Sequence, residues 1–217
     1  MDPISYLRIY DIPELERIAH EQLKKLANGF SIPVDVEHIV EELPNVDLDY
    51  YPCLRSNYGL DGMIGRDPDT KEIIIYIDEE LATSERLLRR YRMTIAEELA
   101  HLILHIKAIE SVEKPNDFLH LHRLPEWYKY ERNAKKLAAM ILMPSEYVLK
   151  HSRNLYHEII SHVGFSNAEV VKNFLASKIA DRYEVSLQAM KIRLGEWPVN
   201  VMDKIDRAMQ DKLDFLD

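Results

Sequence analysis

Apolar and polar positions divide the chain into an early helical stretch, a short strand-rich stretch and a long helical remainder. Apolar residues recur with the period of an amphipathic helix in residues 11–27, 33–43, 84–92, 94–106, 128–143, 145–162, 170–183, 186–194 and 200–213. Alternating or β-branched runs typical of strands fall in residues 46–50, 59–64 and 73–77. Strands that follow one another closely predict a small, mainly antiparallel sheet. Helices on both sides of these strands then predict an α+β fold.

The length of 217 residues suits one fair-sized domain with an appendage. We expect a core in residues 1–150 and a helical C-terminal region in residues 151–217. Residues 180–194 have the rhythm of a helix-turn-helix motif, and basic side chains lie in and beside it at Lys178, Arg182, Lys191 and Arg193. The formal net charge of −9 nevertheless argues against binding to a phosphate backbone, which takes clustered Lys and Arg. Direct nucleic-acid binding is therefore the minor alternative.

The cellular compartment is constrained by three absences in the sequence. No apolar run approaches the ~20 residues that span a bilayer, and the start, Met1-Asp2-Pro3, lacks the basic and apolar segments of a secretory signal. Cys53 is the single cysteine, so no intrachain disulfide can form, and its simplest interpretation is a small packing or surface residue. We expect a cytoplasmic protein that does not associate with membranes.

Residues 94–106 carry the pattern with the clearest chemistry. Glu97 and His101 are four apart and share a helical face, and Glu98 lies on the flank of that pair. The arrangement is that of the zincin helix, His-Glu-x-x-His, in which two histidines bind a metal ion, but here it is written Glu-Glu-x-x-His. An ordinary surface Glu–His pair is the alternative. The apolar residues of this helix predict a largely buried setting, where a charge needs a partner or a metal ion.

The second candidate helix, residues 128–143, begins near Glu131, about 30 residues after His101. In zincins whose third metal ligand is a glutamate, that residue comes from a later helix packed beside the first. A glutamate near a helix N-terminus is equally explained by the helix dipole. The residues alone leave these two interpretations of Glu131 open.

Taken together, the two helices resemble those of a known family. The run Arg92-Met93-Thr94-Ile95-Ala96, followed by Glu98-Leu99, His101 and His105, is similar to the active-site helix of the ImmA/IrrE metallopeptidases, usually Arg-Phe-Thr-x-Ala-His-Glu-Leu-Gly-His. Residues 131–144, which end in Leu142-Met143-Pro144, resemble the third-ligand helix of that family. The resemblance extends over roughly residues 30–195 and rests on the motifs in combination.

The resemblance implies a zincin-like core in a cytoplasmic, zinc-dependent endopeptidase that cuts, or otherwise inactivates, a helix-turn-helix repressor. It implies that His101 and Glu131 are metal ligands and that Glu98 is the general base. The first ligand position of the family is occupied here by Glu97. We therefore expect a metal-dependent regulatory endopeptidase-like protein that acts on a repressor or an antitoxin-like partner. The alternative is a degenerate peptidase fold that binds such a partner without cleaving it.

Glu97 changes the chemistry expected of this ligand set. A second carboxylate offsets more of the ion's charge and weakens its pull on bound water. Harder ligands also shift the preference from zinc toward manganese. Without a metal ion, Glu97, Glu98 and Glu131 repel one another, so one of them should keep a proton. Zinc, manganese and an empty site are thus all compatible with the sequence.

Other histidines are weaker candidates for metal ligands. His157 and His162 are five apart and do not share a helical face. His120 and His122 fall in a segment with few helical features, residues 114–125, and suit solvated loop positions. His105 lies one turn beyond His101, and we expect it to pack or to support a ligand rather than to be one.

Overall fold

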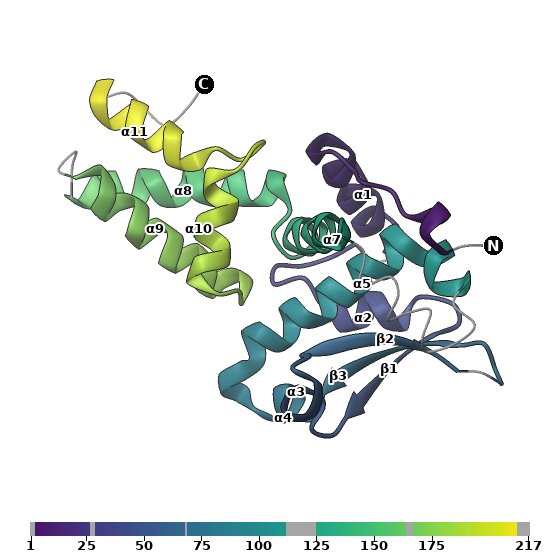
Figure 1. Ribbon diagram of the computed structural model, residues 1–217. Helices are drawn as coiled ribbons and strands as arrows, with labels where there is room; N and C mark the ends of the chain where they lie inside the picture. Colours follow the sequence, from purple (N-terminus) through teal and green to yellow (C-terminus); the bar gives the residue numbers. More distant parts are fainter. Residues whose placement is uncertain (1–2, 27–28, 68, 112–124, 164–166, 212–217) are drawn as a thin grey trace. The chain divides into compact units, whose positions relative to one another are not determined.

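The computed structural model describes residues 3–26, 29–67, 69–111, 125–163 and 167–211. The chain forms two compact units (Figure 1). The first unit consists of Met1–Ser31 and Asp35–Ile141, and the second consists of Ile32–Val34 and Leu142–Asp217. The fold is α+β, as predicted.

The sheet has three strands, β1 (Val46–Tyr51), β2 (Gly62–Arg66) and β3 (Ile73–Asp78), in the order β1-β3-β2 (Figure 1). β2 pairs with β3 antiparallel, whereas β1 pairs with β3 parallel. The sheet is therefore mixed rather than mainly antiparallel. The short link between β2 and β3 forces those strands to run in opposite directions. The longer link after β1 contains α3 (Leu54–Tyr58) and lets β1 pair on the other side of β3.

Besides this sheet, the first unit consists of helices. They are α1 (Ile12–Lys24), α2 (Val36–Glu41), α3, α4 (Glu79–Thr83), α5 (Leu88–Ser111) and most of α7 (Trp127–Leu142), with short 3-10 turns η1 (Pro3–Tyr6) and η2 (Glu85–Leu87). α5 packs against β2, β3 and α2. The core between them is apolar and fully buried at Ile75, Ile77, Ile95 and Leu99. The periodicity predicted α1, α5 and α7 but not the one-turn helices α3 and α4.

The second unit contains α8 (Ser145–Val163), α9 (Ala168–Tyr183), α10 (Leu187–Gly195) and α11 (Val201–Asp211), close to the ranges predicted. Asn167 caps α9 by accepting hydrogen bonds from the backbone N–H groups of Glu169 and Val170. Ser186 caps α10 in the same way through Ala189. None of the helices in the described part of the chain is long and apolar enough to cross a membrane.

Arg193 on α10 is a structural residue of the second unit. Its side chain is 1% exposed, and Nε donates to the Met143 carbonyl at 3.0 Å while Nη2 donates to Ser145 Oγ at 2.6 Å. It therefore joins α10 to the beginning of α8. Arg193 was counted among the basic residues of the helix-turn-helix-like stretch, but in this position it cannot contact a phosphate.

Candidate functional site

α5 carries three of the four predicted site residues. Glu97 and His101 lie one turn apart on the same face, and Glu98 lies beside them. All three are partly buried, while Leu99 and Ala100 between them are fully buried. The helix thus packs its apolar side into the core and presents its carboxylates and imidazole at the edge of that core.

α7 supplies the fourth predicted residue, Glu131. Its Oε1 lies 3.3 Å from Nε2 of His101, with 14% and 32% of the His101 and Glu131 side chains exposed. The structure therefore brings together the two residues that the family resemblance implied as ligands. It also favours a specific role for Glu131 over a simple interaction with the helix dipole, because the carboxylate points to α5.

Trp127 also takes part in this contact, although it was not among the site residues predicted from the sequence. Its indole Nε1 donates to Glu131 Oε1 at 3.0 Å. Its ring stacks on the His101 imidazole, with 4° between the planes and 6.1 Å between the centroids. Trp127 is four residues before Glu131 on α7, so the same spacing rule that linked Glu97 to His101 could have identified it.

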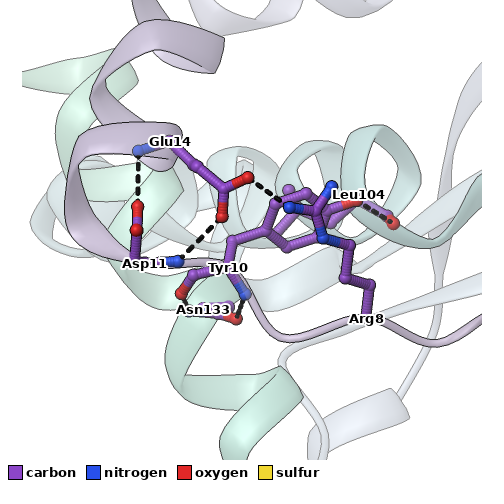
Figure 2. Close-up of polar contacts among 6 residues, drawn as sticks. All are labelled: Arg8, Tyr10, Asp11, Glu14, Leu104 and Asn133. Atoms are coloured by element: carbon purple, nitrogen blue, oxygen red, sulfur yellow. Dashed lines mark hydrogen bonds and ion pairs between the residues drawn. The ribbon is translucent and has the colours of Figure 1, made fainter.

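The N-terminal segment holds α7 against α5 near this contact. The Tyr10 N–H donates to Asn133 Oδ1 at 2.8 Å, and Asn133 Nδ2 donates to the Tyr10 carbonyl at 3.0 Å. The Tyr10 hydroxyl reaches the Leu104 carbonyl of α5 at 3.5 Å (Figure 2). Asn133 is 3% exposed and lies two positions after Glu131. This clamp therefore fixes the part of α7 that carries the carboxylate.

A pocket of about 460 Å³ opens beside these residues within the first unit. Its polar wall contains the four predicted site residues, together with Arg90, Lys135 and His105. Its apolar wall includes Leu7, Leu60, Met63, Ile64, Met93 and Ile109. At one end Arg90 pairs with Asp61, with Nε and Nη2 at 2.6 and 2.5 Å from Asp61 Oδ2. The pocket thus combines apolar surface with charges of both signs.

Gly62 on β2 allows the sheet edge to approach α5 closely. A Cβ atom at this position would lie 2.7 Å from Thr94 Cγ2 and 3.0 Å from Glu98 Cγ and Oε1. No side chain fits there without displacing these residues. Strand β2 therefore lies directly against the helix at the predicted base, Glu98.

The electrostatics of the site follow from burial of several carboxyl groups around one imidazole. Burial raises the pKa of Glu98 to about 7, although His101 acts in the opposite direction. Burial also raises the pKa of Glu97, against the opposing charge of Lys135. Burial acts to lower the pKa of His101, but the hydrogen bond to Glu131 and the nearby carboxylates leave that pKa raised. These directions agree with carboxyl groups that share a proton when no cation is bound.

His105 has surroundings that the sequence did not reveal. It is 3% exposed and lines the pocket, and its φ/ψ of −127°/17° interrupt the helical backbone of α5. Neither ring nitrogen makes a hydrogen bond of acceptable geometry within the described residues. Its ring centroid is 5.6 Å from that of His101 and 5.7 Å from that of Tyr130, which meets it edge-on. Burial lowers the pKa of His105 to about 4, so the ring is neutral near pH 7.

The predicted ligands fit a metal ion only in part. Tetrahedral zinc ligands at roughly 2.0–2.1 Å from the ion lie about 3.3 Å from one another, and His101 Nε2 and Glu131 Oε1 are 3.3 Å apart. No set of three His, Cys, Asp or Glu side chains is gathered closely enough to hold an ion anywhere in the described ranges. Glu97 therefore does not complete a site as the side chains lie, and the ligand set with Glu97 stays a prediction.

The remaining histidine candidates lie elsewhere. His157 and His162 are on α8 in the second unit, and His162 Nδ1 contacts the Glu158 carbonyl of its own helix at 2.8 Å. His120 and His122 fall outside the described residues. Cys53, the single cysteine, is exposed.

Comparison with known proteins supports the resemblance. No curated protein matches the chain. The family model for peptidase M78, described as the IrrE N-terminal-like domain, matches residues 65–195, which include β3, α5 and α7. This match covers more than half of the chain and both helices of the site. The chain belongs to the peptidase M78 family, the ImmA/IrrE metallopeptidase family.

Proposed function

We propose that this chain is a regulatory member of its family that binds a segment of a protein partner in the pocket beside α5 without hydrolysing it. The partner that the family resemblance implies is a helix-turn-helix repressor or an antitoxin-like protein. The observation that carries this proposal is Glu97, a partly buried carboxyl group in the family's first ligand position whose pKa is raised by burial. A carboxylate in place of the family's imidazole offsets more of an ion's charge and weakens the ion's pull on bound water.

The pocket has the properties expected of a peptide site. Its volume of about 460 Å³ lies within the roughly 300–1,000 Å³ typical of ligand pockets. Apolar residues such as Met63 and Met93 can receive apolar side chains, and Arg90 and Glu98 can bind polar groups. Strand β2 pairs only with β3 among the described strands, so an extended segment can add to its other edge.

The polar contacts of the site also favour binding over catalysis. His101 and Glu131 form an ion pair with each other, and Trp127 donates to the same carboxylate oxygen. These groups satisfy one another without a metal ion.

The reducing cytoplasm implied by the family also suits a chain whose one cysteine has no intrachain partner.

The zinc- or manganese-dependent endopeptidase predicted from the sequence is the second candidate function. Glu98 favours it, because this carboxyl group lines the pocket beside His101 and has a pKa of about 7, which suits a general base. In that case Glu97, His101 and Glu131 would bind the ion, and the ion would polarise the scissile carbonyl.

Peptides that bind the wild-type protein can be selected from a random library. The dissociation constants of these peptides for pocket variants then test the binding proposal. Leu60 lines the pocket and is 42% exposed, so Leu60→Arg should fold normally and weaken binding about tenfold or more, or 1.4 kcal/mol. Leu88, also 42% exposed but outside the pocket lining, provides the matched control Leu88→Arg, for which the Kd should change by less than about twofold. Equal weakening by both variants would refute a pocket-specific site.

Mass spectrometry of the same peptides separates binding from hydrolysis. We expect the bound peptide to stay intact after prolonged incubation with the wild-type protein and added zinc or manganese. Cleavage that Glu98→Gln abolishes would overturn the binding-only proposal in favour of the endopeptidase.

A further inference from the structure

The charged side chains that line the pocket differ in how far they are exposed to solvent. Its arginine and its lysine, Arg90 on α5 and Lys135 on α7, are both exposed. Its acidic residues are all half-buried, and they are Asp61, Glu97, Glu98 and Glu131. The side chain of Arg90 is 46% exposed, against 24% for Asp61 and 32% for Glu131. A ligand that enters the pocket therefore meets more accessible positive charge than negative charge.

Two of these acidic groups already have cationic partners. Glu131 Oε1 lies 3.3 Å from His101 Nε2. Asp61 Oδ2 accepts a hydrogen bond from Arg90 Nε at 2.6 Å, and Asp61 Oδ1 lies 3.6 Å from Arg55 Nε. This single carboxylate serves two guanidinium groups, so it does not neutralise both of them.

Lys135 forms no ion pair within the described part of the chain. Glu131, one turn earlier on α7, pairs with His101 instead. Of the charged groups around Glu97, Lys135 has the largest effect and acts to lower the pKa of that carboxyl group, although burial outweighs it. The Lys135 ammonium group therefore lies toward the Glu97 end of the pocket and keeps its hydrogen-bond donors for a ligand.

We propose that the partner segment bound in this pocket carries an aspartate or glutamate whose carboxylate binds Lys135. Arg90 precedes Glu97 by seven residues on the same face of α5, or about 10 Å along the helix axis, and adds positive potential at that end. This inference rests on the proposed function, because it names the chemistry of the segment that the pocket binds.

The apolar wall of the pocket strengthens such an ion pair. An ion pair in open water contributes little to binding, because water screens both charges. Met63 and Met93 line the same pocket, and a segment seated against them excludes water from around the pair. The net charge of −9 disfavours a polyanion such as a nucleic acid, which needs clustered cations. We therefore expect a protein segment that combines apolar side chains with one acidic side chain.

Peptides selected on the wild-type protein test this preference when both of their ends are blocked, so that only side chains carry charge. In each peptide whose binding Leu60→Arg weakens, every acidic residue is replaced in turn by the matching amide. One replacement should weaken binding to the wild type about fivefold or more, and binding to Lys135→Met less than about twofold. Lys107→Met is the matched control, because Lys107 is exposed on α5 but does not line the pocket. It should keep the wild-type dependence on the acid.

Charge reversal separates recognition by Lys135 from a structural role of this residue. Lys135→Glu should bind the acidic peptide more weakly than the wild type does. It should bind the same peptide with lysine in place of the acid more tightly than the wild type does. A purely structural role would weaken the binding of both peptides alike and would overturn the proposal. Circular dichroism melting checks that both variants of Lys135 are folded.

The failure of this proposal differs from the failure of the proposed function. Pocket-binding peptides that keep their affinity when each acid is replaced would overturn the acidic preference and leave the proposed function intact. Peptides that Leu60→Arg and Leu88→Arg weaken equally do not bind in the pocket, and that result would refute both proposals.

Discussion

His101 and Glu131 come from different helices, yet His101 Nε2 lies 3.3 Å from Glu131 Oε1. This contact joins the two motifs through which the chain resembles the ImmA/IrrE family. Trp127 and the clamp between Tyr10 and Asn133 hold the contact in place. The pocket beside it, with Glu97 at the family's first ligand position, is the basis of the proposed function.

The close approach of β2 to α5 predicts that Gly62→Ala destabilises the protein. The new Cβ would lie 2.7 Å from Thr94 Cγ2, so the strand or the helix must shift, at a cost of about 1–3 kcal/mol. Urea denaturation gives the free energy of unfolding. Gly195→Ala is the control, because a Cβ there meets no atom within 4 Å. It should change stability by less than about 0.5 kcal/mol. Equal effects would contradict the packing described.

Removal of the clamp predicts a loss of stability near the N-terminus. Asn133→Ala removes two hydrogen bonds to the Tyr10 backbone and leaves its N–H and C=O without these partners, at a cost of about 2 kcal/mol. Hydrogen exchange should increase around Tyr10. Asn173→Ala, at an exposed position on α9, should cost less than about 0.5 kcal/mol. Unchanged exchange around Tyr10 would show that Asn133 does not anchor this segment.

The surroundings of His151, which lies outside the pocket, predict that the free energy of unfolding depends on pH. Its Nδ1 contacts the Tyr183 hydroxyl at 2.8 Å, and burial, with Arg182 and Lys150, lowers its pKa below 6.5. The unfolded chain therefore binds a proton at higher pH than the folded chain. This contribution to stability is present above pH 6.5 and is lost as the pH falls through 6.5 toward the folded pKa.

Urea denaturation of the wild type and of His151→Gln at several pH values tests whether stability falls with pH for this reason. Between pH 7.5 and pH 5.5 the variant should lose less stability than the wild type, because glutamine does not titrate. Between pH 8.5 and pH 7.5 the two proteins should change equally. An identical loss in both proteins at the lower pH would exclude His151 as a source of the pH dependence.

The sequence predicted the elements that depend on local periodicity. α7 was predicted close to its observed range, whereas the single helix α5 was predicted as two helices, in residues 84–92 and 94–106. The family resemblance, not the residues alone, linked His101 to Glu131. The parallel pairing of β1 with β3 was not predicted, because it joins strands that are separated by β2 in the sequence. The one-turn helix α3 begins after Cys53 in the left-handed region, a conformation that periodicity does not reveal.

Burial at single positions was harder to predict than secondary structure. His105 was expected to pack or to support a ligand, but its burial against Tyr130 of α7 and the local break in α5 could not be read from the pattern. Arg193 was counted among the basic residues of the helix-turn-helix-like stretch, yet it is buried and its partners Met143 and Ser145 lie about fifty positions earlier in the chain. Both cases depend on contacts between distant segments that no local pattern encodes.

We propose that Glu97 has removed hydrolysis while leaving the partner site. Incubation of a pocket-binding peptide with zinc and three proteins tests it most directly. We predict that the wild type leaves the peptide intact and that Glu97→His, which restores the family ligand, cleaves it. The double variant Glu97→His/Glu98→Gln should again be inactive, because it lacks the general base. Cleavage by the wild type that Glu98→Gln removes, or no gain from Glu97→His, would contradict the account.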